Sequence, residues 1–436
     1  MPNLARLLWY LNGAMWRLHW DKGKLRRYQE KRLRAVVKYA YDFVPFYHEK
    51  FRAAGVLPSD IRTLENLSKL PVIWKDVIKD ESPTRVVSRE FRVNRLKEVR
   101  TSGSTGKPFQ VFINGVEDDW RKSIYMRANV SCGQRARDRW VVVTTPHHFS
   151  DTTGIQHALG VFAQTCVNLY SDASEQIRLV KEAKPDVLDG YSGWLVSLAK
   201  EVKRRGVESI RPRIMFGSAE FVDEASVRLM EEVFGAPFYD QFGCSEVDRT
   251  AWVCPAKVGY HMDVDSVITQ FVDDDGEGVA CGESGDVVYT SLFNYAMPLI
   301  RYGVGDVGAA SDEECSCGRV LPLMKVVEGR RDSVLVLPGG GFLSPVTFLA
   351  AMNAFDLYGQ IEEFRLVQKK VDLFKIFVRK KDSRVDESVL GSRLATHVAK
   401  SLGTDVSGVS VDVEFVDEVP VGSGGKHRSV VSEVRV

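Results

Sequence analysis

The middle of the chain alternates β-branched runs with helical patterns, and this alternation constrains its fold more than any other feature. The strand-like runs are Trp140–Thr144, Asp186–Asp189 and Arg213–Phe216, and the helical patterns are Glu175–Ala183, a stretch from a capping Ser192 to about Arg205, and a stretch from a capping Asp223 to Phe234. Such alternation is typical of a mostly parallel sheet covered by helices, whose ligands gather at the carboxyl ends of the strands. We therefore predict an α/β fold with its site at that edge.

The pattern changes past Glu328. Short strands are expected at Val334–Leu337, Glu363–Gln368, Phe374–Arg379 and Val411–Phe415, with one helix starting near Pro345 and another whose apolar stripe is Leu390, Leu394, Val398 and Leu402. A chain of 436 residues exceeds the usual size of one domain. We predict a large domain over residues 1–328 and a small α+β domain over residues 329–436.

A loop rich in hydroxyls and glycines separates two extended segments near residue 100. The stretch Thr101–Phe109 reads Thr-Ser-Gly-Ser-Thr-Gly-Lys-Pro-Phe. Its glycines let the backbone approach a ligand, and its successive N–H groups, its hydroxyls and Lys107 suit phosphate oxygens. The glycine spacing and Pro108 exclude a Walker loop. The stretch indicates another kind of phosphate-binding loop or, alternatively, a solvated hairpin turn.

Further stretches combine glycine with polar or charged residues next to strand-like runs. They are Gly217–Glu220, Tyr239–Glu246, Arg301–Asp306, Gly329–Asp332 and, near the C-terminus, Pro420–Lys426. In this order and at about these separations, the set resembles the adenylate-forming superfamily, and within it the phenylacetate-CoA ligase branch with its capsule-biosynthesis and deazaflavin-adenylylating relatives. The segments Val37–Tyr41, Val44–Tyr47 and Leu70–Val72 are also similar to that branch, so the resemblance covers nearly the whole chain.

The resemblance implies a two-step reaction. A carboxylate attacks the α-phosphorus of ATP to give an acyl adenylate and pyrophosphate, and a thiol or amine then displaces AMP. Because the first step brings an anion towards a polyanion, positioning and charge neutralisation must supply most of the catalysis. The resemblance also implies a mobile C-terminal lid that rotates about a hinge at Asp332.

The resemblance assigns residues to the nucleotide. Those expected around the phosphates are Ser102, Gly103, Ser104, Thr105, Gly106 and Lys107, with Glu246 holding Mg²⁺. Those expected around the nucleoside are Asp306 on the ribose hydroxyls with Arg330 beside it, Gly217, Ser218 and Glu220 along the adenine, Tyr239 or Phe242 stacking near the base, and Gly243 and Ser245 in the same motif.

Lys426 lies on a glycine-rich loop and would bridge the attacking carboxylate and the α-phosphate. A unit charge 4 Å from another contributes about 4 kcal/mol at an effective dielectric near 20, roughly a thousandfold in rate if it acts mainly in the transition state. Without the other motifs, Lys426 and Asp332 read as a surface lysine and a helix-capping aspartate.

The sequence motifs say less about which carboxylic acid is activated and which group accepts the acyl chain. His148, Phe149 and Tyr191 are candidates for the acyl pocket, as is Trp194, although exposure or packing explains them as well. The run Gly339–Phe342 departs from the usual form of a loop that faces the acceptor in relatives. It leaves open whether the acceptor is coenzyme A, an amine or a sugar.

Three thiols and an imidazole have the chemistry of a zinc site. Cys254 and His261 are followed by Cys315 and Cys317, which could complete a tetrahedral structural Zn²⁺ site of a kind that several members of the branch carry. Unligated thiols are the alternative, because Cys-x-Cys is a weak signal.

Composition limits partners and location. A net charge of +1 removes a global electrostatic case for nucleic acid, and seven scattered cysteines favour a reducing compartment, hence the cytoplasm. The apolar stretch Leu7–Leu11 with Trp16 and Trp20 is too short and too charged to span a bilayer. It is either a helix docked on its own domain or an interfacial helix on a membrane surface. Dimers are common in the branch, so a homodimer is possible.

These expectations together describe an ATP-dependent, AMP-forming carboxylate ligase that uses Mg²⁺ and passes its acyl group to coenzyme A. The rivals are acyl transfer to an amine or sugar, nucleotidyl transfer to a hydroxyl of a deazaflavin-type cofactor, and a nucleotide-binding scaffold without turnover. The joint presence of Glu246, Asp306 and Lys426 argues against the scaffold.

Overall fold

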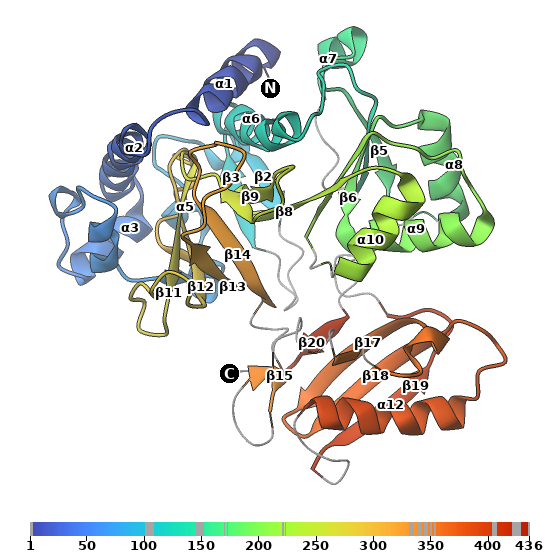
Figure 1. Cartoon of the computed structure of the whole chain (residues 1–436). Coiled ribbons are helices and arrows are strands. Elements are labelled where there is room, and N and C mark those ends of the chain that lie inside the picture. The colour runs from blue at the N-terminus through green and yellow to red at the C-terminus, as the bar shows by residue number, and fades with distance from the viewer. Residues whose placement is uncertain are drawn as a thin grey trace. The chain divides into compact units, whose positions relative to one another are not determined.

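The computed structural model describes residues 3–100, 109–144, 152–169, 171, 173–219, 222, 224–330, 335–337, 342–343, 348, 351–352, 355–402, 408–420 and 429–434. The chain divides into two compact units (Figure 1). One comprises Met1–Val304 and Gly308–Lys325, and the other comprises Val326–Val436 with Gly305–Val307. Each unit has its own sheet and its own apolar core.

A long mixed sheet organises the larger unit. Its strand order is β11-β12-β13-β14-β10-β9-β8-β7-β6-β4-β5, and β1 pairs with β13. The strands are β1 (Ile73–Trp74), β4 (Trp140–Thr144), β5 (Gln164–Asn168), β6 (Val187–Tyr191), β7 (Ile214–Ser218), β8 (Phe238–Cys244), β9 (Asp248–Val253), β10 (Tyr260–Met262), β11 (Val267–Val272), β12 (Gly285–Ser291), β13 (Tyr302–Ser311) and β14 (Leu323–Arg330). A separate antiparallel pair joins β2 (Lys97–Arg100) and β3 (Gln110–Ile113).

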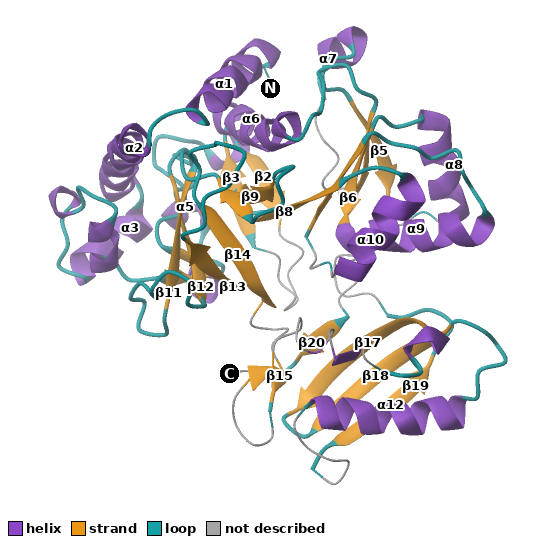
Figure 2. Cartoon of the chain, viewed as in Figure 1, coloured by secondary structure: helices purple, strands orange, loops and turns teal. Residues whose placement is uncertain are grey.

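The strands from β4 to β8 form the parallel part of this sheet, as the alternating pattern predicts. Helices α8 (Ala173–Ala183), α9 (Ser192–Arg205) and α10 (Glu224–Phe234) lie beside these strands (Figure 2). Their apolar faces join the buried side chains of the strands in one core that includes Leu188, Leu195, Met215 and Phe234. This core holds the carboxyl ends of β6, β7 and β8 at one edge.

The expected cap at Ser192 is wrong in its detail. The residue before α9 is Tyr191, which makes no side-chain capping bond, and Ser192 is the first residue of the helix. Ser192 is buried, and its Oγ lies 2.5 Å from the position that a Cβ on Gly217 would occupy. Close packing of α9 on β7, rather than capping, therefore accounts for this small residue.

The strands after β8 form an antiparallel group, which the strand–helix alternation does not predict. The pairs β8–β9, β9–β10, β10–β14 and β11–β12 are all antiparallel. Their sequences lack the regular helical insertions that make parallel strands recognisable. This part of the sheet carries both the loop after β8 and the cysteine cluster described below.

Helices at the N-terminus cover the larger unit. They are α1 (Leu4–Arg17), α2 (Lys22–Phe43), α3 (Pro45–Ala53), α4 (Lys75–Ile78) and α5 (Pro83–Val86), followed later by α6 (Gly115–Ser131) and α7 (Gly154–Leu159). Pro45 begins α3, where its missing N–H costs nothing. The α1 helix packs on α6 through Leu7, Leu11 and Ala14 (Figure 1). The N-terminal segment is thus docked on its own unit, one of the two expectations for it.

The smaller unit is an α+β structure built on four strands in the order β19-β18-β17-β20. Its elements are β15 (Leu335–Val336), β16 (Phe342–Leu343), β17 (Ile361–Lys370), β18 (Leu373–Lys380), α12 (Glu387–Ser401), β19 (Ser410–Phe415) and β20 (Val430–Ser432). The predicted stripe of α12 is buried against the sheet. Asp386 caps α12 by accepting from the N–H groups of Ser388 and Val389.

Candidate functional site

A tight hairpin presents Glu246 after β8. A Cβ on Gly243 would lie 2.3 Å from the carbonyl oxygen of Asp248, so only glycine permits this approach of β8 to β9. Asp248 itself has a positive φ of 67°, a conformation that costs energy in a non-glycine residue. Arg121 of α6 holds the turn by donating to the carbonyl oxygen of Ser245 at 2.8 Å and pairing with Asp248 at 3.6 Å. Glu246 is thereby fixed at the end of β8.

The Glu246 carboxylate is buried and surrounded by two donors. Lys75 Nζ and Tyr302 Oη each lie 3.0 Å from its Oε1 atom, and only 2% of Glu246 is exposed. The ring of Phe109 stacks on Tyr302 at 5.9 Å and lies 6.0 Å from Lys75 Nζ. A buried carboxylate oxygen of this kind fits a hard cation such as Mg²⁺. Sequence reasoning missed Lys75 and gave Tyr302 no role.

Arg301 fastens the segment that carries Lys75. Its guanidinium donates to the carbonyl oxygens of Leu67 and Leu70, at 3.3 and 2.6 Å, and to that of Gly276, while its own carbonyl accepts from Ile73 N–H at 2.8 Å. The motif residue Arg301 therefore acts through the backbone. It positions β1 against β13. Because Lys75 directly follows β1, this pairing also positions Lys75.

The loop after β7 is strained where the sequence predicts an adenine contact. Gly217 is buried and Ser218 is partly buried at the end of the strand, and Ala219, which is exposed, has a φ of 72°. Strained non-glycine backbone of this kind clusters at binding sites. The observation supports a ligand-facing role for this turn.

The two aromatic candidates in the next motif differ in accessibility. Tyr239 is buried, and its ring centroid lies 6.0 Å from that of Phe216. Phe242 is partly buried and meets Tyr260 edge-on at 6.4 Å. Of the two, Phe242 is the more exposed.

Asp240 lies between them on β8, and the sequence motif assigns it no role. Tyr260 Oη donates to its Oδ2 at 2.5 Å. Withdrawal from water raises the pKa of Asp240 to about 7, against the opposing effect of this hydrogen bond. Burial likewise raises the pKa of Asp189 on β6 to about 6, although Tyr125 and Trp140 donate to its carboxylate.

The acyl-pocket candidates are only partly described. Tyr191 ends β6 and is half-buried at the carboxyl edge of the sheet. Trp194 is buried and donates from Nε1 to Gln176 Oε1 at 2.6 Å, which explains it as a packing residue. His148 and Phe149 lie outside the described residues.

Several other predicted residues also fall outside the described part of the chain. They are the loop Ser102, Gly103, Ser104, Thr105, Gly106 and Lys107, then Glu220, the hinge Asp332 and Lys426. Asp306 lies on β13 and is buried, and Arg330 is the last residue of β14. The structure thus brings Glu246 together with Lys75 and Tyr302, and places Gly217, Ser218, Tyr239 and Phe242 on neighbouring strands.

The predicted Cys/His set converges. One potential ligand atom from each of Cys254, His261, Cys315 and Cys317 lies within 4.8 Å of all the others. The two Sγ atoms of Cys254 and Cys315 are 3.5 Å apart, and Cys317 Sγ is 3.3 Å from His261 Nε2. Zinc–ligand lengths of 2.3 Å to sulfur and about 2.0 Å to nitrogen correspond to tetrahedron edges of about 3.8 and 3.5 Å. The observed separations are close to those edges.

The protonation of His261 and Cys317 suits a metal, whereas burial raises the pKa of the Cys315 thiol to about 12. Burial lowers the pKa of His261 to about 4, so its imidazole is neutral at physiological pH. Its Nδ1 atom lies 3.2 Å from the carbonyl oxygen of Leu321, which directs Nε2 towards Cys317. The pKa of Cys317 is lowered although burial opposes this, because the backbone N–H and side chain of Arg319 favour the thiolate.

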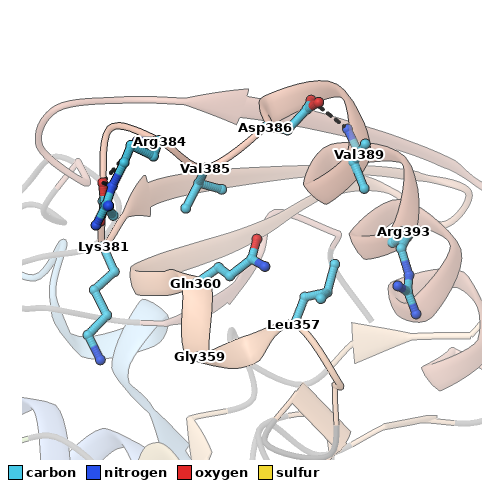
Figure 3. A pocket seen from close by; sticks show the side chains of 10 residues that line it. Leu357, Gly359, Gln360, Lys381, Arg384, Val385, Asp386, Val389 and Arg393 are labelled. Carbon is cyan, nitrogen blue, oxygen red and sulfur yellow. Dashed lines mark hydrogen bonds and ion pairs between the residues drawn. The ribbon is translucent and has the colours of Figure 1, made fainter.

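An open groove of about 830 Å³ lies on the smaller unit (Figure 3). Its charged side chains are largely engaged with their own surroundings. Arg384 pairs with Asp382 at 2.6 Å, Arg393 pairs with Asp356, and Asp386 caps α12. Of the predicted site residues that the structure describes, none lines this groove.

No family model matches the chain. It is similar to phenylacetate-coenzyme A ligases, at 28% identity over 396 residues to that of Thermus thermophilus (88% of this chain, 84% of that protein) and at 28% over 328 residues to that of Pseudomonas putida (72% of each). Among solved structures, 2-hydroxyisobutyryl-CoA ligase in the postadenylation state with 2-HIB-AMP gives a TM-score of 0.77 at 22% identity, over 96% of this chain and 91% of that one. An anthranilate-CoA ligase with anthranoyl-AMP gives 0.57 at 18% identity, over 87% and 74%. The structural likeness confirms the predicted α/β fold.

Proposed function

From the similarity of the chain to phenylacetate-coenzyme A ligases over most of its length, we propose that it belongs to the phenylacetate-CoA ligase-like branch of the adenylate-forming enzymes and is an ATP-dependent, AMP-forming ligase. It converts a carboxylic acid into an acyl adenylate and transfers the acyl group to coenzyme A. The observation that carries this proposal is the extent of the likeness: 396 residues, 88% of the chain, align with one such ligase. A ligase similar in fold is described with both 2-HIB-AMP and CoA, which supports coenzyme A as the acceptor.

The site residues receive roles from their chemistry. Glu246, held by Tyr302 and Lys75, is the carboxylate for the Mg²⁺ that accompanies ATP. The turn at Gly217 and Ser218, with Glu220, contacts the adenine, and Phe242 or Tyr239 stacks near the base, with Phe242 the more exposed of the two. Asp306 takes the ribose hydroxyls, with Arg330 beside it. The glycine-rich loop from Ser102 to Lys107 takes the phosphates, as expected from its composition.

Lys426 supplies the charge for the adenylation step. It belongs to a glycine-rich segment of the smaller unit and brings an ammonium group to the reacting carboxylate and α-phosphate. Rotation at Asp332 is the motion that delivers it, with a large domain over residues 1–328 and a lid over residues 329–436. His148, Phe149 and Tyr191 remain the candidates for the acid pocket.

A structural zinc ion fits the Cys/His cluster on the donor set and spacing given above. Cys254, His261, Cys315 and Cys317 would hold it, and its contribution would be to stability. It would fasten the connection between β13 and β14 to strands β9 and β10.

The location and assembly that we propose follow from composition and family. All seven cysteines are free, which suits the reducing cytoplasm. In the described part of the chain, no helix combines the length and the apolar character that a bilayer crossing requires. Association as a homodimer stays a prediction.

The test is acid-dependent exchange of pyrophosphate into ATP across a panel of aryl, short-chain and hydroxylated acids, followed by detection of the coenzyme A thioester. We expect exchange with at least one acid alone and thioester only when coenzyme A is added. Lys426→Met and Glu246→Gln should each lower exchange by about a thousandfold or more, while the exposed control Lys181→Met should not. Absence of exchange with every acid would favour nucleotidyl transfer or a scaffold.

A further inference from the structure

The outer face of α1 is an exposed aromatic surface. Trp9 is 71% exposed, Trp16 is 67% exposed and Leu8 is 38% exposed. At about 100° per residue, Trp9 and Trp16 project from the side of the helix opposite to the buried Leu7 and Leu11. Large aromatic side chains are seldom left in water without a function, and two of them share one helix face here.

The opposite face of α1 is already packed on its own unit. Arg17, its last residue, pairs with the buried Asp265 at 2.5 Å, and Asp265 also accepts from Arg127 at 2.8 Å. Although burial opposes it, the charges of Arg127 and Arg17 lower the pKa of Asp265 to about 2, so the pairs persist at physiological pH. These ion pairs anchor the C-terminal end of α1, whose two tryptophans are exposed.

A strongly basic surface adjoins the tryptophans. The segment from Lys22 to Arg34 contains seven lysines and arginines and one acid, Glu30, whereas the whole chain has a net charge of only +1. Ion pairs join Lys22 to Glu314, and Arg26 to Glu30 and Glu65. Further exposed cations of the segment include Lys24, Arg27 and Lys31.

Lys24 joins the two surfaces. Its Nζ lies 5.2 Å from the ring centroid of Trp16 and 4.5 Å from that of Trp20. Lys24 therefore links the aromatic side of α1 to the basic side of α2. The exposed side chains of these two sides are called here the α1–α2 patch, which is defined by Leu8, Trp9, Trp16, Lys22, Lys24, Arg27 and Lys31. In Figure 1, α1 and α2 follow each other along one border of the larger unit, with α6 on the inner side of α1.

We propose that the α1–α2 patch docks the protein on the surface of a membrane that contains anionic lipids. Tryptophans favour the boundary between headgroups and acyl chains, and each lysine or arginine near an anionic surface adds roughly a further kcal/mol, about fivefold in binding. A second copy of the chain fits the patch less well. A twofold dimer through the patch would place two segments of the same high positive charge against each other.

Flotation of the full-length protein with lipid vesicles tests this proposal. We expect the protein to float with vesicles of phosphatidylcholine mixed with phosphatidylglycerol at low salt, and to stay behind with vesicles of phosphatidylcholine alone. The double variant Trp9→Gln/Trp16→Gln should bind about tenfold more weakly or worse. The double variant Arg27→Gln/Lys31→Gln should lose about fivefold for each charge removed, and high salt should have a similar effect on the unchanged protein.

Matched controls separate the patch from general stickiness. Ile155 and Leu159 of α7 are 63% and 54% exposed, so Ile155→Gln/Leu159→Gln removes comparable apolar surface elsewhere. Lys181→Gln/Lys400→Gln removes two exposed charges from other helices. Both controls should float as the unchanged protein does.

The proposal is overturned if the unchanged protein does not float with anionic vesicles or if the tryptophan variant floats equally well. It is also overturned if that variant instead lowers the sedimentation coefficient, which would identify a self-association surface.

Discussion

Tyr302 donates its phenolic hydrogen to Oε1 of Glu246 across 3.0 Å, although the two residues are 56 positions apart in the chain. Tyr302 begins β13 and is fully buried, and Glu246 stands in the turn between β8 and β9. The hydrogen bond therefore joins two separate motifs into one carboxylate site. It fixes the direction of the group that we assign to Mg²⁺.

Replacing Tyr302 by phenylalanine should weaken adenylation while leaving the fold intact. A hydrogen bond to a charged group contributes about 1.5 to 3 kcal/mol, so we expect pyrophosphate exchange at limiting Mg²⁺ and ATP to fall roughly tenfold or more. Steady-state exchange over a range of Mg²⁺ concentrations measures this effect. The matched control is Tyr289→Phe, since Tyr289 is equally buried but shares its hydrogen bond with Thr250 at 2.8 Å. Equal losses in the two variants would show that the effect is one of packing.

We expect Arg301 to contribute mainly to the stability of the folded protein. Its guanidinium reaches carbonyl oxygens on two separate segments and the residue is 2% exposed, so Arg301→Met leaves several carbonyl groups without their donor. We expect the free energy of unfolding of the larger unit to fall by about 3 kcal/mol or more. Urea unfolding followed by tryptophan fluorescence provides the measurement. Arg384→Met, at a side chain that is 89% exposed, should change the value by less than about 0.5 kcal/mol. A small effect of both variants would contradict the role given to Arg301.

The fold class and the family resemblance could be predicted from the sequence, because regular strand–helix alternation and ordered motifs are local signals. The structural neighbours confirm the fold class, and the similarity to phenylacetate-CoA ligases agrees with the family that the motifs indicate. The Cys/His convergence was also predicted, since thiols and imidazole are rare enough to be counted. Lys75 and Tyr302 could not be found in this way. Their role depends on β1 pairing with β13, a contact between segments more than 200 residues apart that no local pattern records.

Asp240 should make the stability of the protein fall as the pH rises. Its pKa is about 7 in the folded chain and near 3.8 ordinarily, so the folded state holds the proton more tightly. The stabilisation is complete below about pH 4 and is lost as the pH rises through 7, with a change of up to about 2 to 3 kcal/mol between pH 5 and pH 8. Asp240→Asn retains an acceptor for Tyr260 but cannot ionise. Urea unfolding at both pH values should therefore show a smaller difference for this variant.

The control for this titration is Asp372→Asn, at an exposed position of the smaller unit. It should reproduce the pH dependence of the unchanged protein. Asp189→Asn should remove a smaller part of the pH dependence, because the pKa of Asp189 is raised only to about 6. If Asp240→Asn leaves the pH dependence of the unfolding free energy unchanged, the carboxyl group of Asp240 in the unchanged protein is already ionised at pH 5.

Removal of the proposed zinc should lower the stability of the protein but leave acid-dependent pyrophosphate exchange unchanged. Purified without chelators, the protein should contain about one zinc per chain, and Cys317→Ser should lose it, because three ligands hold the ion less tightly than four. The control is Cys281→Ser, at an exposed cysteine outside the cluster. A strong chelator should lower the unfolding midpoint of the unchanged protein and of the control, but not that of Cys317→Ser. Acid-dependent pyrophosphate exchange below the new midpoint should persist in all of them, since the cluster packs around His261 and does not include Glu246. If metal analysis finds well under one zinc per chain in the unchanged protein, the zinc proposal is wrong and the four side chains of the cluster are unligated.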